Sequence, residues 1–183
     1  MKTTKILPCT LALLFALALP VSALAQPQPQ PAFAEGRVAA IVSGDTLRVD
    51  VPGHGQWRVR LAWVAAPALR QAHGEAARSG LNALAAGQAV RLENPRATGG
   101  EWVARVWAPP PGARCGDAGC PPTLDLGQAQ IERGWAWHDR RTPGQGEPAA
   151  SDYAQAEFMA KIRRLGLWAG QNPVPPWAWQ GPR

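Results

Sequence analysis

Two charged side chains, Asp45 and Arg60, lie in the stretch of the chain with the clearest strand pattern. A carboxylate can hold a metal ion and a guanidinium can hold a phosphate, so these residue types are candidates for chemistry. Apolar and polar residues alternate along 47–51 and again along 57–63, and a period of two indicates strands with one buried face. With a further strand at 38–42, the stretch predicts an antiparallel meander that places Asp45 in a turn and Arg60 on the last strand.

The rest of the chain predicts the elements that surround this meander. Good helix formers with an apolar face occupy 68–87, where Gly87 is suited to end a helix, and Asp125 is suited to the N-cap of a helix through Arg133. The remaining elements are strands at 89–93 and 102–107, and a last helix that Ser151 caps and whose inner face carries Tyr153, Ala156, Phe158, Met159 and Ile162. This order predicts an α+β fold, namely a five-stranded barrel of the OB type with about three helices packed around it.

Several short motifs occur in a fixed order along the chain. They are Gly44-Asp45-Thr46, Val59-Arg60-Leu61, His73-Gly74-Glu75-Ala76-Ala77, 126–137, 153–168 and Pro176-Trp177-Ala178-Trp179. In type and order these motifs resemble the staphylococcal nuclease-like (thermonuclease) family over about residues 37–180. The resemblance implies an OB barrel of the staphylococcal nuclease type. As an activity, it implies calcium-dependent hydrolysis of phosphodiester bonds in DNA or RNA.

The family's active site uses two aspartates and a backbone carbonyl on the metal, a glutamate that activates water, and two arginines that hold the phosphate. By resemblance, Asp45 is the first metal ligand and Arg60 is the first catalytic arginine. Ala65 replaces the second aspartate, Ala68 replaces the glutamate, and Glu101 stands in place of the second arginine. Because losing a general base typically costs about a hundred- to ten-thousand-fold in rate, the resemblance predicts a catalytically inactive module. Calcium is then expected to bind weakly at most, with no other cofactor.

Alternatives to an inactive module stay open. The chain is an active nuclease with a rearranged site if other groups, such as His73 as a base or Glu101 as a metal ligand, serve near Asp45 and Arg60. Arg60 has a structural role instead if it pairs with Asp45 across neighbouring strands. Three other candidates are interpreted as surface or structural side chains: His54, His138 and Glu75.

The expected partner is nucleic acid or an envelope protein. A nucleic-acid binder needs several arginines on one face, and the candidates are Arg37, Arg48, Arg58, Arg91 and Arg105. A protein-docking module needs an exposed apolar patch instead. The nine tryptophans are interpreted as core or rim packing rather than as platforms for base stacking. Trp102 and Trp107 fall on opposite faces of one strand, so exposure of one of the two is open.

The first residues of the chain predict export. Residues 1–25 have basic residues, a short apolar run and a small-x-small site that ends at Ala25, which is the pattern of a secretory signal peptide. Its removal takes away two lysines and lowers the formal charge from +6 to +4. Residues 26–36 are a Gln/Pro-rich leader that is expected to be disordered, and 37–180 form one domain. We expect a secreted or periplasmic monomer without a transmembrane segment.

Cys115 and Cys120 lie close together in a Gly/Pro-rich loop. In an oxidising compartment, two such cysteines most simply form one disulfide. A zinc site would need two more ligands, and no histidine stands near them in sequence.

Overall fold

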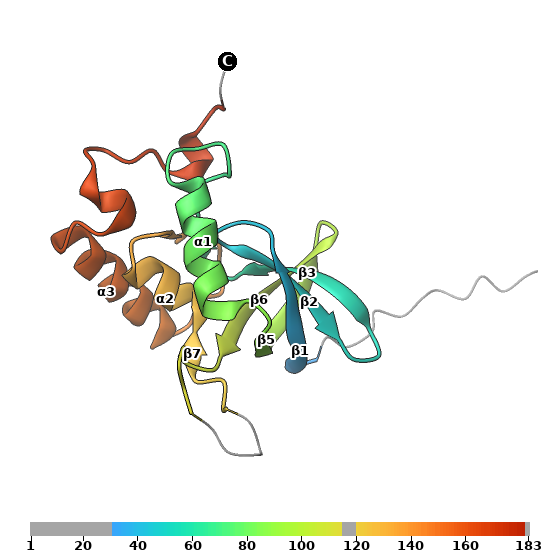
Figure 1. Cartoon of the computed structure of the whole chain (residues 1–183). Helices are drawn as coiled ribbons and strands as arrows, with labels where there is room; N and C mark the ends of the chain where they lie inside the picture. Colours follow the sequence, from blue (N-terminus) through green and yellow to red (C-terminus); the bar gives the residue numbers. More distant parts are fainter. Residues whose placement is uncertain (1–30, 115–119, 182–183) are drawn as a thin grey trace, which may run out of the picture.

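The structure, a computed structural model, describes residues 31–114 and 120–181 (Figure 1). The predicted signal peptide at 1–25, residues 26–30 of the predicted leader and Cys115 lie outside the described residues. The rest of the leader was expected to be disordered, but residues 33–36 form the start of β1, because they pair with β5. The strands are β1 (Phe33–Ile41), β2 (Thr46–Val51), β3 (Gly55–Leu61), β4 (Val64–Ala65), β5 (Ala89–Thr98), β6 (Glu101–Ala108), β7 (Leu124–Asp125) and β8 (Trp137–His138). The helices are α1 (Gly74–Ala85), α2 (Leu126–Glu132) and α3 (Ala149–Ile162), with short 3-10 helices η1 (Gly166–Ala169) and η2 (Pro176–Ala178).

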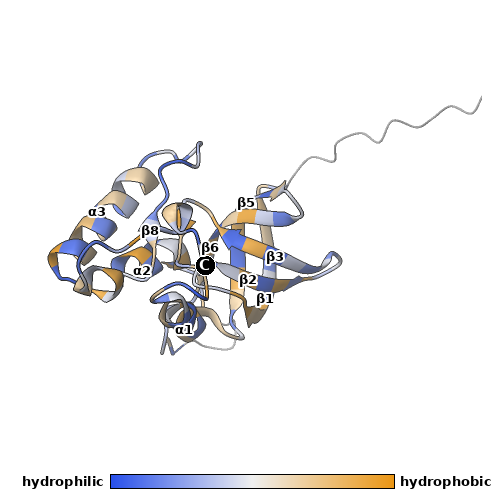
Figure 2. Cartoon of the chain, turned by 90° about the horizontal axis from the view of Figure 1, so that it is seen from above, coloured by the Kyte–Doolittle hydropathy of each residue, from blue (hydrophilic) through white to orange (hydrophobic). Residues whose placement is uncertain are grey.

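Five strands close into a barrel. The strand order is β3-β2-β1-β5-β6, and β3 also pairs in parallel with β6, which joins the two ends of the sheet. Strand β7 pairs antiparallel with the end of β6, while β4 and β8 form a separate two-stranded sheet. Helices α2 and α3 lie side by side at one flank of the barrel (Figures 1 and 2). The predicted α+β fold, a five-stranded barrel with three helices, is confirmed.

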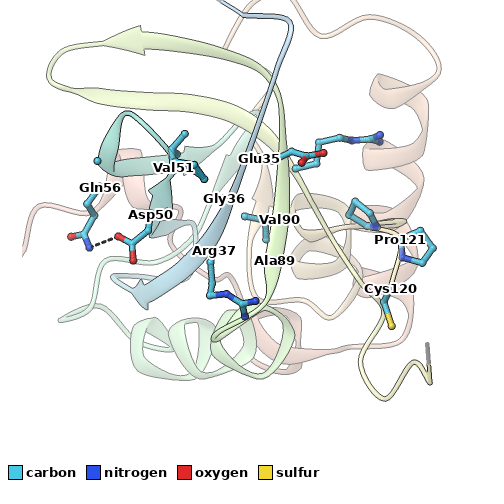
Figure 3. Close-up of a pocket in the computed structure, with 14 residues that line it drawn as sticks. Glu35, Gly36, Arg37, Asp50, Val51, Gln56, Ala89, Val90, Cys120 and Pro121 are labelled. Atoms are coloured by element: carbon cyan, nitrogen blue, oxygen red, sulfur yellow. Dashed lines mark hydrogen bonds between the residues drawn. The ribbon is translucent and has the colours of Figure 1, made fainter. Parts of the chain in front are cut away.

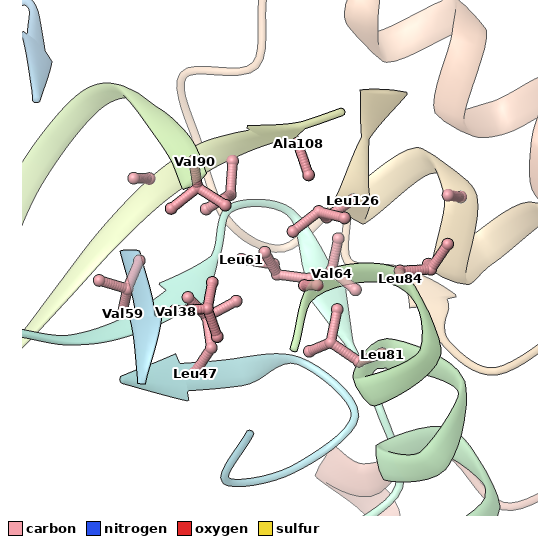
Figure 4. Close-up of a cluster of buried hydrophobic side chains, with 14 of the residues drawn as sticks. Val38, Leu47, Val59, Leu61, Val64, Leu81, Leu84, Val90, Ala108 and Leu126 are labelled. Atoms are coloured by element: carbon pink, nitrogen blue, oxygen red, sulfur yellow. The ribbon is translucent and has the colours of Figure 1, made fainter. Parts of the chain in front are cut away.

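Apolar side chains on the inner faces of the strands fill the barrel. Leu47, Val49 and Val59 are completely buried, as the alternation in the meander predicts. Helix α1 adds Leu81 and Leu84 to the same core (Figure 4). Burying a side chain of this size stabilises the fold by about 1.5–3 kcal/mol. The core therefore fixes which residues of each strand point inward, and it directs the polar residues between them to the outer surface.

The tryptophans of the barrel are packed, as expected. Trp57 on β3 and Trp102 on β6 stack with their ring centroids 3.9 Å apart. Trp57 is buried and Trp102 packs against the core. On the outer face of β6, the Nε1 of Trp107 donates a hydrogen bond of 2.7 Å to Glu93. These rings are therefore engaged within the protein rather than free to stack on bases.

Helix α1 begins later than predicted, at Gly74, because residues 68–73 form turns. Gln71 holds these turns. Its backbone N–H donates to the carbonyl of Ala68, its Oε1 accepts from the N–H of Ala68, and its Nε2 donates to the carbonyl of Val174. The contact with the C-terminal segment thus outweighs the helix propensity of this stretch.

Helix α3 differs from the prediction in its start and its inner face. It begins at Ala149 and follows Pro148, so Ser151 lies inside the helix and is not its cap. Phe158 and Ile162 were expected to be buried, but they are 60% and 64% exposed. The buried face consists of Ala149, Tyr153, Ala156, Glu157 and Ala160. Their helical spacing and mostly small side chains let α3 pack closely, which turns the larger apolar residues outward. Within residues 31–114 and 120–181, no helix is long and apolar enough to cross a membrane.

Candidate functional site

Three hydrogen bonds hold the carboxylate of Asp45 at the turn between β1 and β2. Its Oδ1 accepts hydrogen bonds from the hydroxyls of Ser43 at 2.7 Å and Thr46 at 3.0 Å. Its Oδ2 accepts from the backbone N–H of Ala66 at 3.0 Å, and its backbone carbonyl accepts from Leu61 at 2.8 Å. Each contact joins the turn to itself or to the chain around the end of β3. Asp45 therefore has a structural role in this geometry.

The residues around Asp45 do not fit a calcium ion. Calcium takes about six to eight oxygen ligands, several of them from carboxylates. Ala65 is buried in β4, where it pairs with Trp137 of β8, and Ala68 offers a methyl group. Among the residues that the structure describes, no cluster of three or more His, Cys, Asp or Glu side chains could hold a metal ion. Asp45 therefore belongs to no such cluster among the described residues, and the positions of Ala65 and Ala68 offer no carboxylate.

Arg60 forms an ion pair with Glu101. The Nε of Arg60 donates to Oε1 of Glu101 at 2.8 Å, and the Nε of Arg58 lies 3.5 Å from Oε2 of the same carboxylate. The contact is possible because β3 pairs with β6, which brings the first residue of β6 beside the end of β3. The alternative in which Arg60 pairs with Asp45 is wrong, because Arg60 pairs with Glu101 instead. The oxygens of Asp45 accept from Ser43, Thr46 and Ala66.

A cleft of about 590 Å³ lies between the outer surface of the barrel and the loop at 142–148. Arg60 of β3, Val103 of β6 and Arg96 of β5 line it. Val103 pairs with Arg60 on one side and with Arg96 on the other, so the three residues form a row across neighbouring strands. The Nε1 of Trp63 donates to the carbonyl of Pro143 at 3.3 Å, which fastens the loop to the barrel.

A buried network supports the far side of this cleft. Asp125 accepts a 2.6 Å hydrogen bond from Nε of Arg105, and the hydroxyl of Tyr153 lies 3.0 Å from both of its carboxylate oxygens. The same carboxylate accepts from the backbone N–H groups of Gly127 and Gln128, so Asp125 is the N-cap of α2 as predicted. Burial disfavours the charge on Arg105, but the bond to Asp125 outweighs it and raises the pKa of Arg105. Burial first, and the negative charge of Asp125 second, raise the pKa of Tyr153 far above its usual value.

The histidines give the site no base. His73 is exposed at the start of α1, with a φ of 67°, and His54 is exposed in the β2–β3 turn. His138 was expected to face solvent, but it is buried in β8. Its Nε2 lies 2.6 Å from Oε1 of Gln145, and its Nδ1 accepts from Arg140. The apolar packing around β8 explains the burial, and these contacts give His138 a structural role in anchoring the loop at 142–148.

The predicted arginines do not gather on one face as a single set. Arg48 and Arg58 are cross-strand neighbours on β2 and β3. Arg91 and Arg105 instead lie over the ring of Trp107, within 6.0 Å and 4.4 Å of its centroid. The fifth candidate, Arg37, donates to the carbonyl of Gly87. Any anion-binding surface must therefore be assigned from contacts rather than from a count of arginines.

A second and larger cavity, of about 1030 Å³, lies against β1, β2 and β5 (Figure 3). Glu35, Arg37 and Asp50 line it, so charges of both signs are present. Neither Asp45 nor Arg60 is among its lining residues. It also borders Cys120, which is next to a segment that the structure does not describe. The pairing of Cys115 with Cys120 stays a prediction for the same reason.

Comparison with known proteins identifies the family. The family described as Staphylococcal nuclease homologue matches residues 58–170, which is more than half of the chain. The chain belongs to the staphylococcal nuclease family. It is 32% identical over 158 residues to Protein ParB of Escherichia coli, with 82% of each chain covered. It is 33% identical over 155 residues to a micrococcal nuclease of Shigella flexneri, covering 82% of this chain and 83% of the relative. An uncharacterized endonuclease of Escherichia coli O157:H7 is 26% identical over 147 residues, covering 79% and 84%.

The sequence did not predict that Arg96 and Trp63 line this cleft. Arg96 lies beyond the predicted strand 89–93, because β5 continues to Thr98 past an irregularity between Glu93 and Arg96. Trp63 was assigned only to packing, whereas its indole also lines the cleft. The position of Arg96 opposite Val103 depends on that irregularity, for which the sequence gives no signal other than Pro95.

Proposed function

We propose that this chain is an exported, non-hydrolytic member of the staphylococcal nuclease family that binds single-stranded nucleic acid. The observation that carries the loss of hydrolysis is the ion pair between Arg60 and Glu101. The carboxylate already bonds to Nε of the guanidinium that resemblance assigns to the phosphate, and its charge weakens the attraction of that guanidinium for a phosphate. Asp45 adds to this argument, because both of its oxygens already accept hydrogen bonds, from Ser43 and Thr46 in the turn and from Ala66 after β4.

The size of the expected loss supports an inactive module. Without a glutamate at position 68 there is no carboxylate to activate water at that place, and such a base is typically worth about a hundred- to ten-thousand-fold. A missing donor to the transition-state charge costs about a further hundred- to thousand-fold. The two losses need not multiply in full. Even so, either one removes most of the rate that the family mechanism provides.

Binding of nucleic acid is supported by the cleft rather than by the net charge. Arginines, hydroxyl groups and an indole line one cleft, beside the carboxylates of Glu93 and Glu147. Single-stranded nucleic acid is bound by combinations of cations and aromatic faces. The relatives with printed functions are named as nucleases. An envelope protein is the second candidate, because Phe158 and Ile162 expose apolar surface on α3.

The test is fluorescence anisotropy of a labelled oligodeoxythymidylate with the purified protein in chelator. Binding is expected at low salt, and its affinity should fall with salt by a logarithmic slope of about 0.7 for each phosphate contact. Absence of binding at low salt overturns the nucleic-acid assignment and directs attention to α3. Calcium-dependent cleavage of the same oligonucleotide favours the alternative, an active nuclease with a rearranged site. Export is tested separately by locating the protein in periplasmic and culture fractions of an expressing bacterium.

A further inference from the structure

We propose that Arg96 is the principal phosphate-binding residue of the cleft, and that Glu101 keeps Arg60 from that role. The ligand class is a phosphodiester of single-stranded nucleic acid. This inference rests on the proposed function, and it assigns the contact to a residue outside the motifs that carry the family resemblance.

The strand register places Arg96 where a phosphate in the cleft can reach it. Arg96 and Arg60 are the two neighbours of Val103, one on β5 and one on β3. Because neighbouring strands lie about 4.8 Å apart, the two arginines flank Val103 with their backbones about 10 Å from each other. Both line the cleft, so a phosphate above Val103 has one guanidinium on either side.

Charge pairing distinguishes the three arginines of the cleft. Arg60 donates to Glu101, and Arg105 donates to Asp125. Arg96 is exposed, and within residues 31–114 and 120–181 it has no hydrogen-bond or ion-pair partner. Its five N–H donors are therefore available for two parallel bonds to phosphate oxygens, the geometry that a guanidinium favours.

The loop at 142–148 leaves the approach to Arg96 open. The backbone of Gly144 comes close enough that an added Cβ would lie 3.7 Å from a terminal nitrogen of Arg96. Because glycine has no side chain, the loop leaves the space beside this nitrogen unfilled. Thr98 and Thr142 also line the cleft and offer hydroxyl groups for further phosphate contacts.

Glu101 limits the access of a phosphate to Arg60, whereas the loop leaves Arg96 accessible. Its carboxylate contacts two guanidinium groups of β3: Oε1 is 2.8 Å from Nε of Arg60, and Oε2 is 3.5 Å from Nε of Arg58. A phosphate that binds the terminal nitrogens of Arg60 must lie beside this carboxylate, whose negative charge partly cancels that of the two guanidinium groups. Neutralising residue 101 should therefore make Arg60 available and tighten binding, whereas Arg96 needs no such change.

The test compares single substitutions by anisotropy of labelled oligodeoxythymidylate in chelator. The variants are Arg96→Gln, Arg60→Gln, Glu101→Gln and the control Arg163→Gln. Arg163 is exposed beyond the far end of the 14-residue α3, whose first residue lines the cleft. At a rise of about 1.5 Å per residue, it lies about 20 Å from the cleft. Circular dichroism and the melting temperature establish that each variant is folded.

We expect Arg96→Gln to weaken binding about tenfold, the usual effect of losing one charged hydrogen-bond donor, and to lower the salt slope by about 0.7. Arg60→Gln and Arg163→Gln should change affinity by less than about threefold, and Glu101→Gln should tighten it by about threefold or more. If Arg60→Gln weakens binding more than Arg96→Gln, or if Arg96→Gln matches Arg163→Gln, the inference is wrong although the proposed function stands. If the unaltered protein does not bind, both fail.

Discussion

Replacing Tyr153 with phenylalanine tests the buried network that holds α2 and α3 against the barrel. Tyr153 is completely buried, and its hydroxyl lies 3.0 Å from each carboxylate oxygen of Asp125. Phenylalanine keeps the ring and removes only the donor. Asp125 retains its bonds to Arg105 and to the N-terminus of α2, so the variant isolates one hydrogen bond.

The expected loss follows from the kind of bond that is removed. A hydrogen bond to a charged group contributes about 1.5–3 kcal/mol. We therefore expect Tyr153→Phe to lower the free energy of unfolding by about 2 kcal/mol. For a domain of this size, the melting temperature should fall by about 4–8 °C.

The pH dependence of stability gives a second measurement of the same bond. Burial and the negative charge of Asp125 raise the pKa of Tyr153 in the folded protein. A raised pKa contributes stability that is fully present below the unfolded value of about 10 and is lost as the pH rises above it. The difference between the unaltered protein and Tyr153→Phe should thus be largest below pH 10 and shrink above it.

Both measurements are accessible in one series of urea titrations, followed by tryptophan fluorescence at several pH values. Tyr153 is the one tyrosine of the chain, so the absorption of tyrosinate reports on it alone. Tyrosinate should form only together with unfolding. A variant that loses less than about 0.5 kcal/mol, or tyrosinate that forms near pH 10 in folded protein, would refute the assignment of this hydrogen bond.

Three further predictions concern stability. Burial opposes the charge on Asp139, but its bonds to Arg141 outweigh this effect and lower the pKa of Asp139. The free energy of unfolding should therefore fall as the pH drops below about 4. Urea titrations in acid should show a smaller fall for Asp139→Asn. Gly134→Ala should lower the free energy of unfolding by more than about 1 kcal/mol, because Gly134 has a φ of 74° and its added Cβ would clash with the carbonyl of Leu165. An unchanged melting temperature in thermal unfolding would contradict this. Phe158→Ser should change stability by less than about 0.5 kcal/mol, since the side chain is 60% exposed, and a larger loss would show that it packs in a core.

The sequence predicted the elements whose signals are local. The alternation around Leu47 and Val59 gave the meander, and Asp125 marked the start of α2 correctly. The predicted start of α1 was wrong, because Gln71 donates a hydrogen bond to Val174, a residue 103 positions away. No periodicity within a single helix indicates such a contact.

The site was harder to predict for the same physical reason. The resemblance assigns alanines and a glutamate to positions of the family motif, but the bond between Arg60 and Glu101 depends on pairing of β3 with β6. The place of Arg96 depends on an irregularity in β5. Closure of the barrel sets both contacts, and the single chain carries no local signal for either.

The central claim is that this member of the staphylococcal nuclease family does not hydrolyse nucleic acid by the family mechanism. The most direct measurement is cleavage of labelled single-stranded DNA by the purified protein, with calcium and with chelator, beside the variant Arg60→Ala. We expect no cleavage in calcium above that in chelator, and no difference between the protein and its variant. Calcium-dependent cleavage that Arg60→Ala abolishes would contradict it, because a phosphate would then reach Arg60 despite Glu101.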